Sequence, residues 1–173
     1  MNTELEKAAR QALTQDALKQ MLWYDPETGV FRWRHERNNG KINPWTAAGS
    51  PDNKGHIKIQ IGKQMHRAHR LAWLYMTGAF PMQQIDHRNL IKDDNRWCNL
   101  REANQAQNQW NTGLRRDNKS GVKGVHFSAV YKKWIASCTV NGKRHVLGSF
   151  QTREEAAKVV QEFRKQHHGE YAN

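Results

Sequence analysis

One segment, residues 84–111, constrains the fold of this chain more than any other, and it reads Q-I-D-H-R-N-L-I-K-D-D-N-R-W-C-N-L-R-E-A-N-Q-A-Q-N-Q-W-N. Residues 85–88 and 99–101 are short, and the polar stretch between them predicts two strand-like arms closed by a loop. Residues 102–110 have a helical composition. The segment therefore predicts a small α+β unit, whose arms and helix carry Asp86, His87, Asn99 and Asn108.

The residue types in this segment fit metal-assisted hydrolysis of a phosphodiester. Such a reaction needs a hard cation, a base that takes a proton from water, and basic groups that hold the phosphate backbone. Asp86 and the side-chain carbonyl of Asn108 are hard oxygen ligands. His87 points to the other face of an extended arm, where it can act as the base. Asn99 can fix the loop through hydrogen bonds to the backbone, and two protein ligands leave most of a Mg²⁺ shell open.

Each of these residues also has a simpler interpretation. Adjacent Asp and His residues are commonly an exposed surface pair, Asn99 fits an ordinary turn position, and Asn108 fits a solvated helix position. The order and spacing of all four are more specific than any one of them. His69 has two interpretations of its own. It is either a buried residue at the start of a helix or a second histidine of the site.

The chain carries a strong positive charge. Its 173 residues include 28 Lys and Arg against 16 Asp and Glu, a formal net charge of +12. A field of this sign attracts polyanions, of which nucleic acid is the commonest, and a basic surface that only maintains solubility is the alternative. No run reaches the roughly 20 apolar residues of a membrane span, and the N-terminal residues lack the apolar core of a signal peptide. With two cysteines, the chain is predicted to be cytoplasmic with reduced thiols.

The N-terminal part is predicted to mix helices and short strands. Apolar spacing predicts helices at 3–22 and 69–76, and alternation predicts strands at 29–34, 56–61 and 65–68. The polar stretch after Trp110 marks a boundary. We therefore predict an N-terminal domain at 1–112, a linker at 113–120 and a C-terminal domain at 121–173.

The C-terminal domain is predicted to contain three strands followed by one helix. Strands are expected at 122–127, 133–140 and 144–150, the last two joined by a turn at Asn141 and Gly142. Thr152 and Glu155 form a capping-box pattern that opens a helix running to about residue 166. Helical spacing predicts that the apolar face of this helix meets the sheet, through Ala156, Val159, Val160 and Phe163.

Residues 18–111 resemble the HNH endonucleases of the phage and homing type. The resemblance includes Y-D-P-E-T-G-V-F-R-W-R, H-R-L-A-W, I-D-H, D-N-R-W-C-N-L-R and N-Q-W-N. It implies a ββα-metal fold across about 84–112, in which Asp86 binds metal, His87 is the general base and Asn99 braces the hairpin. Asn108 stands where the family usually has a metal-binding histidine, and Asn104 is the alternative ligand. Arg70, Arg88 and Arg101 are predicted to contact DNA.

Residues 119–173 resemble a second family, the Apetala-type (ethylene-response-factor) DNA-binding domains. The resemblance rests on S-G-V-K-G-V-H-F, K-K-W-I-A-S-C, N-G-K-R-H-V-L-G-S-F, T-R-E-E-A-A and H-G-E-Y-A. It implies a three-stranded antiparallel sheet on one helix, with the sheet facing DNA. Ser137, Thr139 and Val146 are shorter or neutral where plant members carry arginines, which favours backbone contact over base readout. The residues predicted to face DNA are Lys123, His126, Ser128, Lys133, Thr139 and Arg144.

Together these features predict an endonuclease that uses one divalent metal ion, Mg²⁺ or alternatively Mn²⁺, to nick duplex DNA. One site per chain predicts a monomer with no membrane partner, acting in the cytoplasm of a phage-infected bacterium. Two alternatives remain. One is a catalytically weak DNA-binding or regulatory protein that keeps a nuclease-like scaffold. The other is an RNA-directed or structure-specific nuclease, against which the C-terminal sheet argues.

Overall fold

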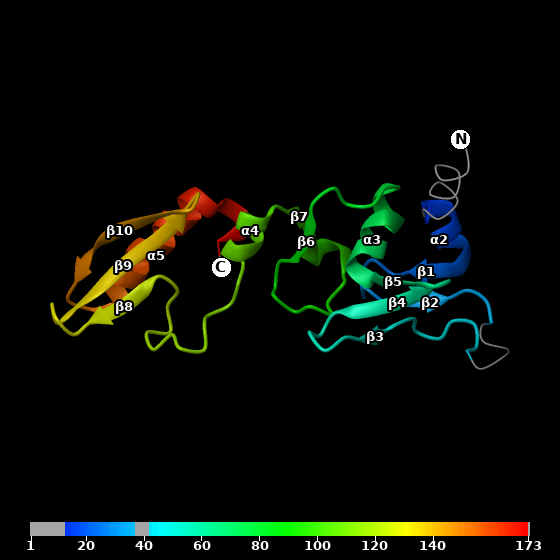
Figure 1. Cartoon of the computed structure of the whole chain (residues 1–173), viewed down its shortest axis with the longest axis horizontal. Coiled ribbons are helices and arrows are strands. Elements are labelled where there is room, and N and C mark those ends of the chain that lie inside the picture. The colour runs from blue at the N-terminus through cyan, green and yellow to red at the C-terminus, as the bar shows by residue number, and fades with distance from the viewer. Residues whose placement is uncertain (1–12, 37–41, 173) are drawn as a thin grey trace, which may run out of the picture. The chain divides into compact units, whose positions relative to one another are not determined.

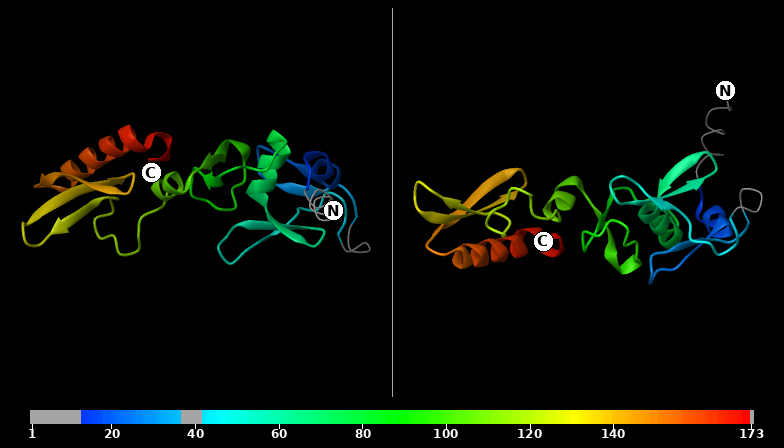
Figure 2. Two further views of the ribbon diagram at one scale, coloured as in Figure 1. Left: turned by 45° about the horizontal axis from the view of Figure 1, so that its top comes forward. Right: turned by 90° about the horizontal axis from the view of Figure 1, so that it is seen from below.

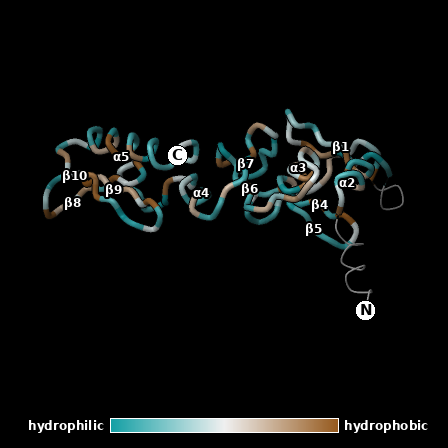
Figure 3. Tube along the Cα trace, turned by 90° about the horizontal axis from the view of Figure 1, so that it is seen from above, coloured by the Kyte–Doolittle hydropathy of each residue, from teal (hydrophilic) through white to brown (hydrophobic). Residues whose placement is uncertain are grey.

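The computed structural model describes residues 13–36 and 42–172, and the chain forms two compact units that divide between Glu102 and Ala103. The fold is mixed α+β, as predicted. Its elements are labelled in Figure 1, and Figure 2 shows each unit from two further sides. Among the described residues, no helix combines the length and apolar character that crossing a membrane requires. The hydropathy colouring in Figure 3 is hydrophilic over much of the chain, in keeping with a mean hydropathy of −0.98.

The described residues of the first unit form helices α2 and α3 and several short strands around one apolar core. Its elements are α2 (Gln15–Met21), β1 (Leu22–Tyr24), β2 (Phe31–Trp33), β3 (Ser50–Pro51), β4 (Ile57–Ile61), β5 (Gln64–Arg67), α3 (Ala68–Thr77), β6 (Gln84–His87), the 3-10 turn η1 (Trp97–Asn99) and β7 (Leu100–Ala103), whose last residue begins the second unit. Strands β1 and β2 pair antiparallel, as do β3 with β4 and β4 with β5. β6 and β7 form a separate two-stranded sheet.

The predicted helix at 3–22 needs a correction at its C-terminal end. Helix α2 begins after Thr14, whose side chain accepts a hydrogen bond from the Ala17 N–H, and it ends at Met21. Leu22–Tyr24 is strand β1 instead, because its backbone pairs with β2. The part of the predicted helix before Leu13 lies outside the described residues. The helix predicted at 69–76 is confirmed as α3, which ends at Gly78 with a left-handed φ of 87°.

The second unit is a three-stranded antiparallel sheet with a helix on one face, as predicted (Figure 1). Its elements are α4 (Gln105–Trp110), β8 (Val125–Ser128), β9 (Lys133–Val140), β10 (Lys143–Phe150), α5 (Arg153–His168) and the 3-10 turn η2 (Gly169–Tyr171). Asn141 and Gly142 connect β9 to β10 with φ values of 50° and 76°, the backbone of a tight hairpin turn. The capping box at Thr152 and Glu155 is confirmed.

The core of the second unit lies between the sheet and α5. Ala156 and Val160 of the helix are buried against Val125 and Ala136 of the strands. Phe163 and Trp134 are partly buried against the same cluster, so the prediction that Phe163 faces the sheet is confirmed. The helix therefore covers one face of the sheet and leaves the other face available for binding.

Candidate active site

Strand β6 places Asp86 and His87 side by side near the protein interior. Their exposed fractions are 4% and 6%. Because successive side chains of a strand point to opposite faces, the carboxylate and the imidazole have different surroundings. Burial of this kind is unusual for an Asp-His pair that serves only as surface polarity.

The carboxylate of Asp86 is paired with Arg101 of strand β7. The Nε and Nη2 atoms of Arg101 lie 2.9 Å and 2.8 Å from Asp86 Oδ2, and the side chains of both residues are 5% exposed. This pairing gives Arg101 a role different from the predicted DNA contact, because its guanidinium is directed into the protein and not toward solvent. It also fixes the position of the carboxylate.

Asn99 ties the two ends of the loop between β6 and β7. Its Oδ1 accepts a hydrogen bond from the Asn89 N–H at 3.0 Å, and its Nδ2 donates to the Asp94 carbonyl at 2.7 Å. The backbone adds a bond from the Arg88 N–H to the Asn99 carbonyl at 2.9 Å. Asp94 is itself paired with Arg96, and this hydrogen bonding lowers the pKa of the Asp94 carboxyl to about 2. The loop is therefore held by its own polar side chains.

This loop places Asn95, which the sequence did not identify as a site residue, beside His87. Its Oδ1 lies 3.3 Å from His87 Nε2, while its Nδ2 donates to the Asp93 carbonyl at 3.1 Å. With the amide oriented in this way, Asn95 Oδ1 accepts a hydrogen bond from the Nε2–H of a neutral His87. One signal was present in the sequence, since Asn95 sits in the polar D-D-N-R run of the loop.

Residues 24–29, which connect β1 to β2, contact the loop at Asn95 and Trp97. The Tyr24 hydroxyl donates to the Asn95 carbonyl at 2.6 Å, and the Trp97 N–H donates to the Pro26 carbonyl at 2.9 Å. Gly29 has a φ of 75°, and a Cβ added there would lie 2.4 Å from the carbonyl carbon of Asn95. Glycine is required at this position because both the backbone conformation and the close approach exclude a larger residue.

Three histidines gather beside the β6 strand. The ring centroids of His69 and His87 are 5.1 Å apart, and the His56 ring lies 5.6 Å from His69 and 6.1 Å from His87. Burial lowers the pKa of His87 below its usual value and that of His69 to about 3, so both rings are neutral near pH 7. His69 is thus both buried at the start of α3 and adjacent to the site. His56 belongs to the same cluster.

The predicted metal ligands are carboxylate and amide oxygens, which are the donor atoms that a hard cation prefers. Within residues 13–36 and 42–172, no group of three or more His, Cys, Asp or Glu is arranged to hold a metal ion. Asp86 of the first unit offers a carboxylate, and helix α4 of the second unit carries the amide oxygens of the predicted ligands. Asn104 uses its Oδ1 to accept the Gln107 N–H at 2.9 Å as the N-cap of α4, which is why the helix begins at residue 105 and not at 102. Asn108 lies half-buried on the same helix.

Arg70 and Arg88 lie in the same unit as β6. Arg70 is half-buried, and its guanidinium donates long hydrogen bonds to the carbonyls of Pro81 and Gln83, at 3.4 Å and 3.5 Å. These bonds hold the segment that leads into β6. Arg88 is exposed directly after β6. Of the two, Arg88 is the side chain better placed to reach a polyanion in solution.

In the second unit, most of the predicted DNA-contact residues share the sheet face opposite α5. His126 pairs with Ile135, Ser128 with Lys133, and Thr139 with Arg144, and paired residues lie on the same side of an antiparallel sheet. Val125 and Ala136, which pair with each other, form the opposite, helix-covered face. Arg144 also donates to the Ser137 hydroxyl at 3.1 Å.

Lys123 does not lie on that face. Its Nζ donates to the carbonyls of Trp110 and Thr112 at 2.8 Å and 2.6 Å. Burial, followed by repulsion from Arg164, lowers the pKa of the Lys123 amine to about 8. The predicted contact between Lys123 and DNA on the outer sheet face is thus replaced by a position inside the second unit.

For the phosphodiester hydrolysis that the sequence predicts, we expect Asn95→Ala to slow the reaction on the order of 10- to 100-fold, because an unoriented imidazole samples the wrong tautomer and position. The effect should fall on kcat with little change in the DNA concentration needed for half-maximal rate. Single-turnover nicking of a plasmid measures it. Asn53→Ala, an exposed asparagine in the same unit, is the matched control. Equal rates for the two variants would remove Asn95 from the site.

The sequence of this chain is similar to those of known proteins. The sequence profile of the HNH endonuclease family matches residues 66–110. Protein 3.8 of Escherichia phage T7 is 30% identical over 116 residues, which cover 64% of this chain and 93% of that protein. The uncharacterized HNH endonuclease L560 of Acanthamoeba polyphaga mimivirus is 30% identical over 118 residues, covering 67% of this chain and 59% of that protein.

One solved structure also aligns with the chain. It is described as DNA binding and cleavage by the HNH homing endonuclease I-HmuI. The structural alignment covers 51% of this chain and 49% of the I-HmuI chain, at 20% sequence identity and a TM-score of 0.38. The profile match includes Asp86, His87, Asn99 and Asn108, and it ends at the last residue of α4.

Proposed function

Because the chain belongs to the HNH endonuclease family, we propose that it is a metal-dependent endonuclease that hydrolyses phosphodiester bonds in duplex DNA and nicks one strand. The observation that carries the proposal is the buried pair on β6, in which Arg101 fixes Asp86 and Asn95 orients His87. A net charge of +12 suits a polyanionic substrate.

His87 is the general base of the proposed reaction. Its Nε2 lies 3.3 Å from Asn95 Oδ1, a contact that holds the ring in place, and the imidazole takes the proton of the attacking water. Burial favours the neutral ring, the form that can accept this proton. Asn99 acts through the loop, because its two hydrogen bonds keep Asn95 in place.

Asp86 and Asn108 would hold the metal ion, with Mg²⁺ the expected ion and Mn²⁺ a substitute. When bound, such an ion neutralises charge that develops on the phosphate and the leaving oxygen. Arg101 orients the Asp86 carboxylate through two short contacts to Oδ2. Asn104, the alternative second ligand, uses its amide oxygen as the N-cap of α4.

The C-terminal sheet is proposed to dock the enzyme on duplex DNA, with domain limits at 1–112 and 121–173. His126, Ser128, Lys133, Thr139 and Arg144 share the face that α5 leaves uncovered. Neutral Ser137 and Thr139 on this face favour contacts to the sugar-phosphate backbone over base readout. One active site per chain fits a monomer that nicks.

Supercoiled plasmid incubated with the protein and Mg²⁺ should become open-circular, and excess EDTA should prevent this conversion. Gel electrophoresis over time separates the supercoiled, nicked and linear forms. Linear product at early times would indicate paired active sites and would contradict nicking by a monomer. No conversion with either Mg²⁺ or Mn²⁺ on any tested sequence would contradict the enzyme.

A DNA-binding protein without useful catalysis is the second candidate. The pairing of Asp86 with Arg101 and the neutral amide at Asn108 favour it, because both weaken a metal site. Duplex DNA that is bound with strong salt dependence, and never cut with metal present, would support this candidate.

A further inference from the structure

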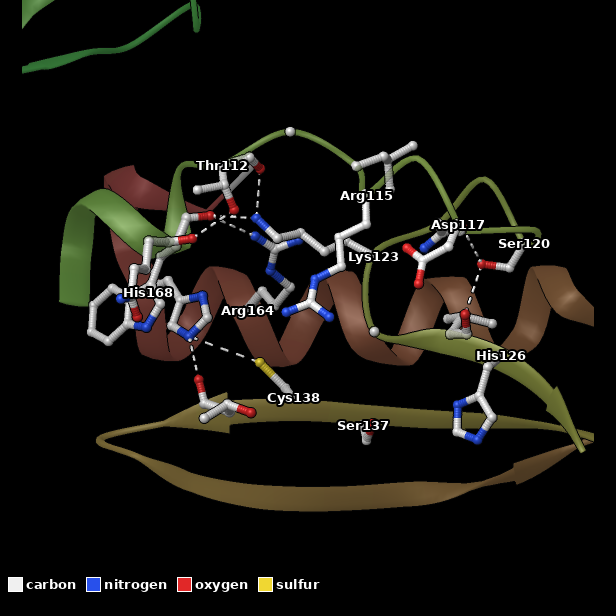
Figure 4. Close-up of a pocket in the computed structure, with 18 of the residues that line it drawn as sticks. Thr112, Arg115, Asp117, Ser120, Lys123, His126, Ser137, Cys138, Arg164 and His168 are labelled. Carbon is white, nitrogen blue, oxygen red and sulfur yellow. Dashed lines mark hydrogen bonds between the residues drawn. The ribbon is translucent and has the colours of Figure 1, made fainter. Parts of the chain in front are cut away.

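The second unit contains a pocket of 1210 Å³ at the open edge of its sheet (Figure 4). Strand β8 pairs with β9 only as far as Ala136, so the following β9 residues have no strand beside them on that edge. The C-terminal end of α4, the segment 112–120 and helix α5 surround the space that is left. None of the residues that line the pocket belongs to β6 or takes part in the hydrolytic chemistry proposed above.

Three cationic side chains, those of Arg115, Lys123 and Arg164, reach into this pocket and toward one another in Figure 4. Arg164 is 7% exposed, and its one hydrogen bond runs from Nη2 to the Trp110 carbonyl at 3.1 Å. Lys123 donates to the same carbonyl and to that of Thr112. Carbonyls at the end of a helix offset part of a positive charge, but they do not neutralise it.

No carboxylate compensates these charges within the part of the chain that the structure describes. Asp117 also lines the pocket, and it forms no ion pair with Arg115, Lys123 or Arg164. Burial and the proximity of Arg164 lower the pKa of Lys123 to about 8, and burial lowers the pKa of Arg164. Buried charges without a counter-ion are unfavourable, and an anion in the pocket would relieve this cost.

The N–H groups of the two arginines that donate no hydrogen bond within the described structure are suited to bind phosphate oxygens. A guanidinium presents five N–H groups, and Arg164 uses one of them, while the guanidinium of Arg115 donates no hydrogen bond to another described residue. Planar guanidinium groups bind phosphate oxygens in pairs, and a lysine ammonium adds a point charge. The pocket wall also includes His126, Ser137 and Thr139 of the uncovered sheet face, so a DNA strand on that face can extend into the pocket.

We propose that this pocket binds a backbone phosphate of DNA, with Arg115, Lys123 and Arg164 as its ligands. The proposal deepens the proposed function, since it adds a DNA-contact site in the second unit that is separate from the outer sheet face. Such a site differs from non-specific attraction by the net positive charge, because one phosphate group contacts three defined side chains.

Arg115→Gln tests the site in the full-length chain, and the neighbouring Arg116→Gln is the matched control. Both arginines are exposed and both variants lose one charge, but Arg116 does not line the pocket. Binding of a fluorescein-labelled duplex oligonucleotide is measured by anisotropy in excess EDTA, where no cutting occurs. Arg115→Gln should weaken binding about tenfold and reduce the slope of log affinity against log salt by about 0.9. Arg116→Gln should change the slope little.

Lys123→Gln gives a second, independent variant. Its amide can still donate to the Trp110 or Thr112 carbonyl, and thermal melting checks that the fold is kept. It should weaken DNA binding as Arg115→Gln does. An equal loss of DNA affinity in Arg115→Gln and Arg116→Gln would mean that only the net charge matters, and this result would overturn the proposal.

Inorganic phosphate distinguishes DNA from a small phosphate compound. Phosphate should compete with the oligonucleotide and change the fluorescence of Trp110 or Trp134, which line the pocket, and Arg115→Gln should abolish the change. A phosphate response that Arg115→Gln removes, together with unchanged DNA affinity, would overturn the DNA assignment. Because all arms contain EDTA, they remain decisive even if the protein proves unable to cut DNA.

Discussion

Replacing His87 with alanine is expected to reduce nicking of supercoiled DNA in Mg²⁺ by about 10²- to 10⁴-fold, the usual contribution of a positioned general base. The reason lies in the geometry of β6. His87 is held against Asn95 in a buried, neutral state, and no other described histidine has both an oriented ring and a neighbouring carboxylate on the same strand. His69 touches the ring of His87, but its Nδ1 has no hydrogen-bond partner in the described structure that would orient it.

The measurement is the initial rate of open-circle formation at fixed Mg²⁺. His35→Ala, an exposed histidine in the same unit, is the control and should leave the rate unchanged. DNA affinity in EDTA should be the same for both variants, because the base acts on water and not on the DNA backbone. A His87→Ala protein that melts normally and still nicks at the wild-type rate would contradict the assignment.

Replacing Arg101 with methionine is expected to lower the free energy of unfolding by about 3–5 kcal/mol. The variant removes both Arg101 nitrogens from Asp86 Oδ2, and a buried carboxylate that loses its cationic partner is strongly destabilising. The same change frees a carboxylate beside His87. Added Mg²⁺ should therefore recover part of the lost stability in this variant if Asp86 is a metal ligand.

Urea unfolding followed by tryptophan fluorescence measures this difference, with and without Mg²⁺. Arg116→Met, which removes an exposed arginine, should change the unfolding free energy by less than about 0.5 kcal/mol. A loss of stability in Arg101→Met below about 1 kcal/mol would mean that water reaches Asp86 freely and that the pair is not a buried one. Stability that does not respond to Mg²⁺ would argue against metal binding by Asp86.

Local patterns in the sequence predicted most of the secondary structure. The capping box at Thr152, the turn at Asn141 and Gly142, and the alternation in β4 and β9 all act within a few residues, so each could be recognised without the fold. The helix predicted to begin at residue 3 was extended one residue too far, through Leu22, because β1 is a strand only through its pairing with β2. Similarly, α4 starts later than predicted because Asn104 caps it.

The site was predicted in composition but not in its contacts. Asp86, His87 and Asn99 could be named because their order and spacing are unusual. The roles of Asn95 and Arg101 could not, since an asparagine in a loop and an arginine after Asn99 have many possible partners. Lys123 illustrates the same limit. Its charge suggested a DNA contact, but its ammonium lies against the end of α4, 11 to 13 residues away in sequence.

The sequence by itself determined the α+β class, the strongly basic character, and the residues that a hydrolytic site would need. These properties follow from local propensity, periodicity and charge, which depend on neighbouring residues alone. Only the tertiary structure decided that Asp86 is paired with Arg101, that Asn95 orients His87, and that three cations share one pocket. Each of these contacts joins residues brought together by strand pairing or helix packing, and burial then fixes their partners and their protonation.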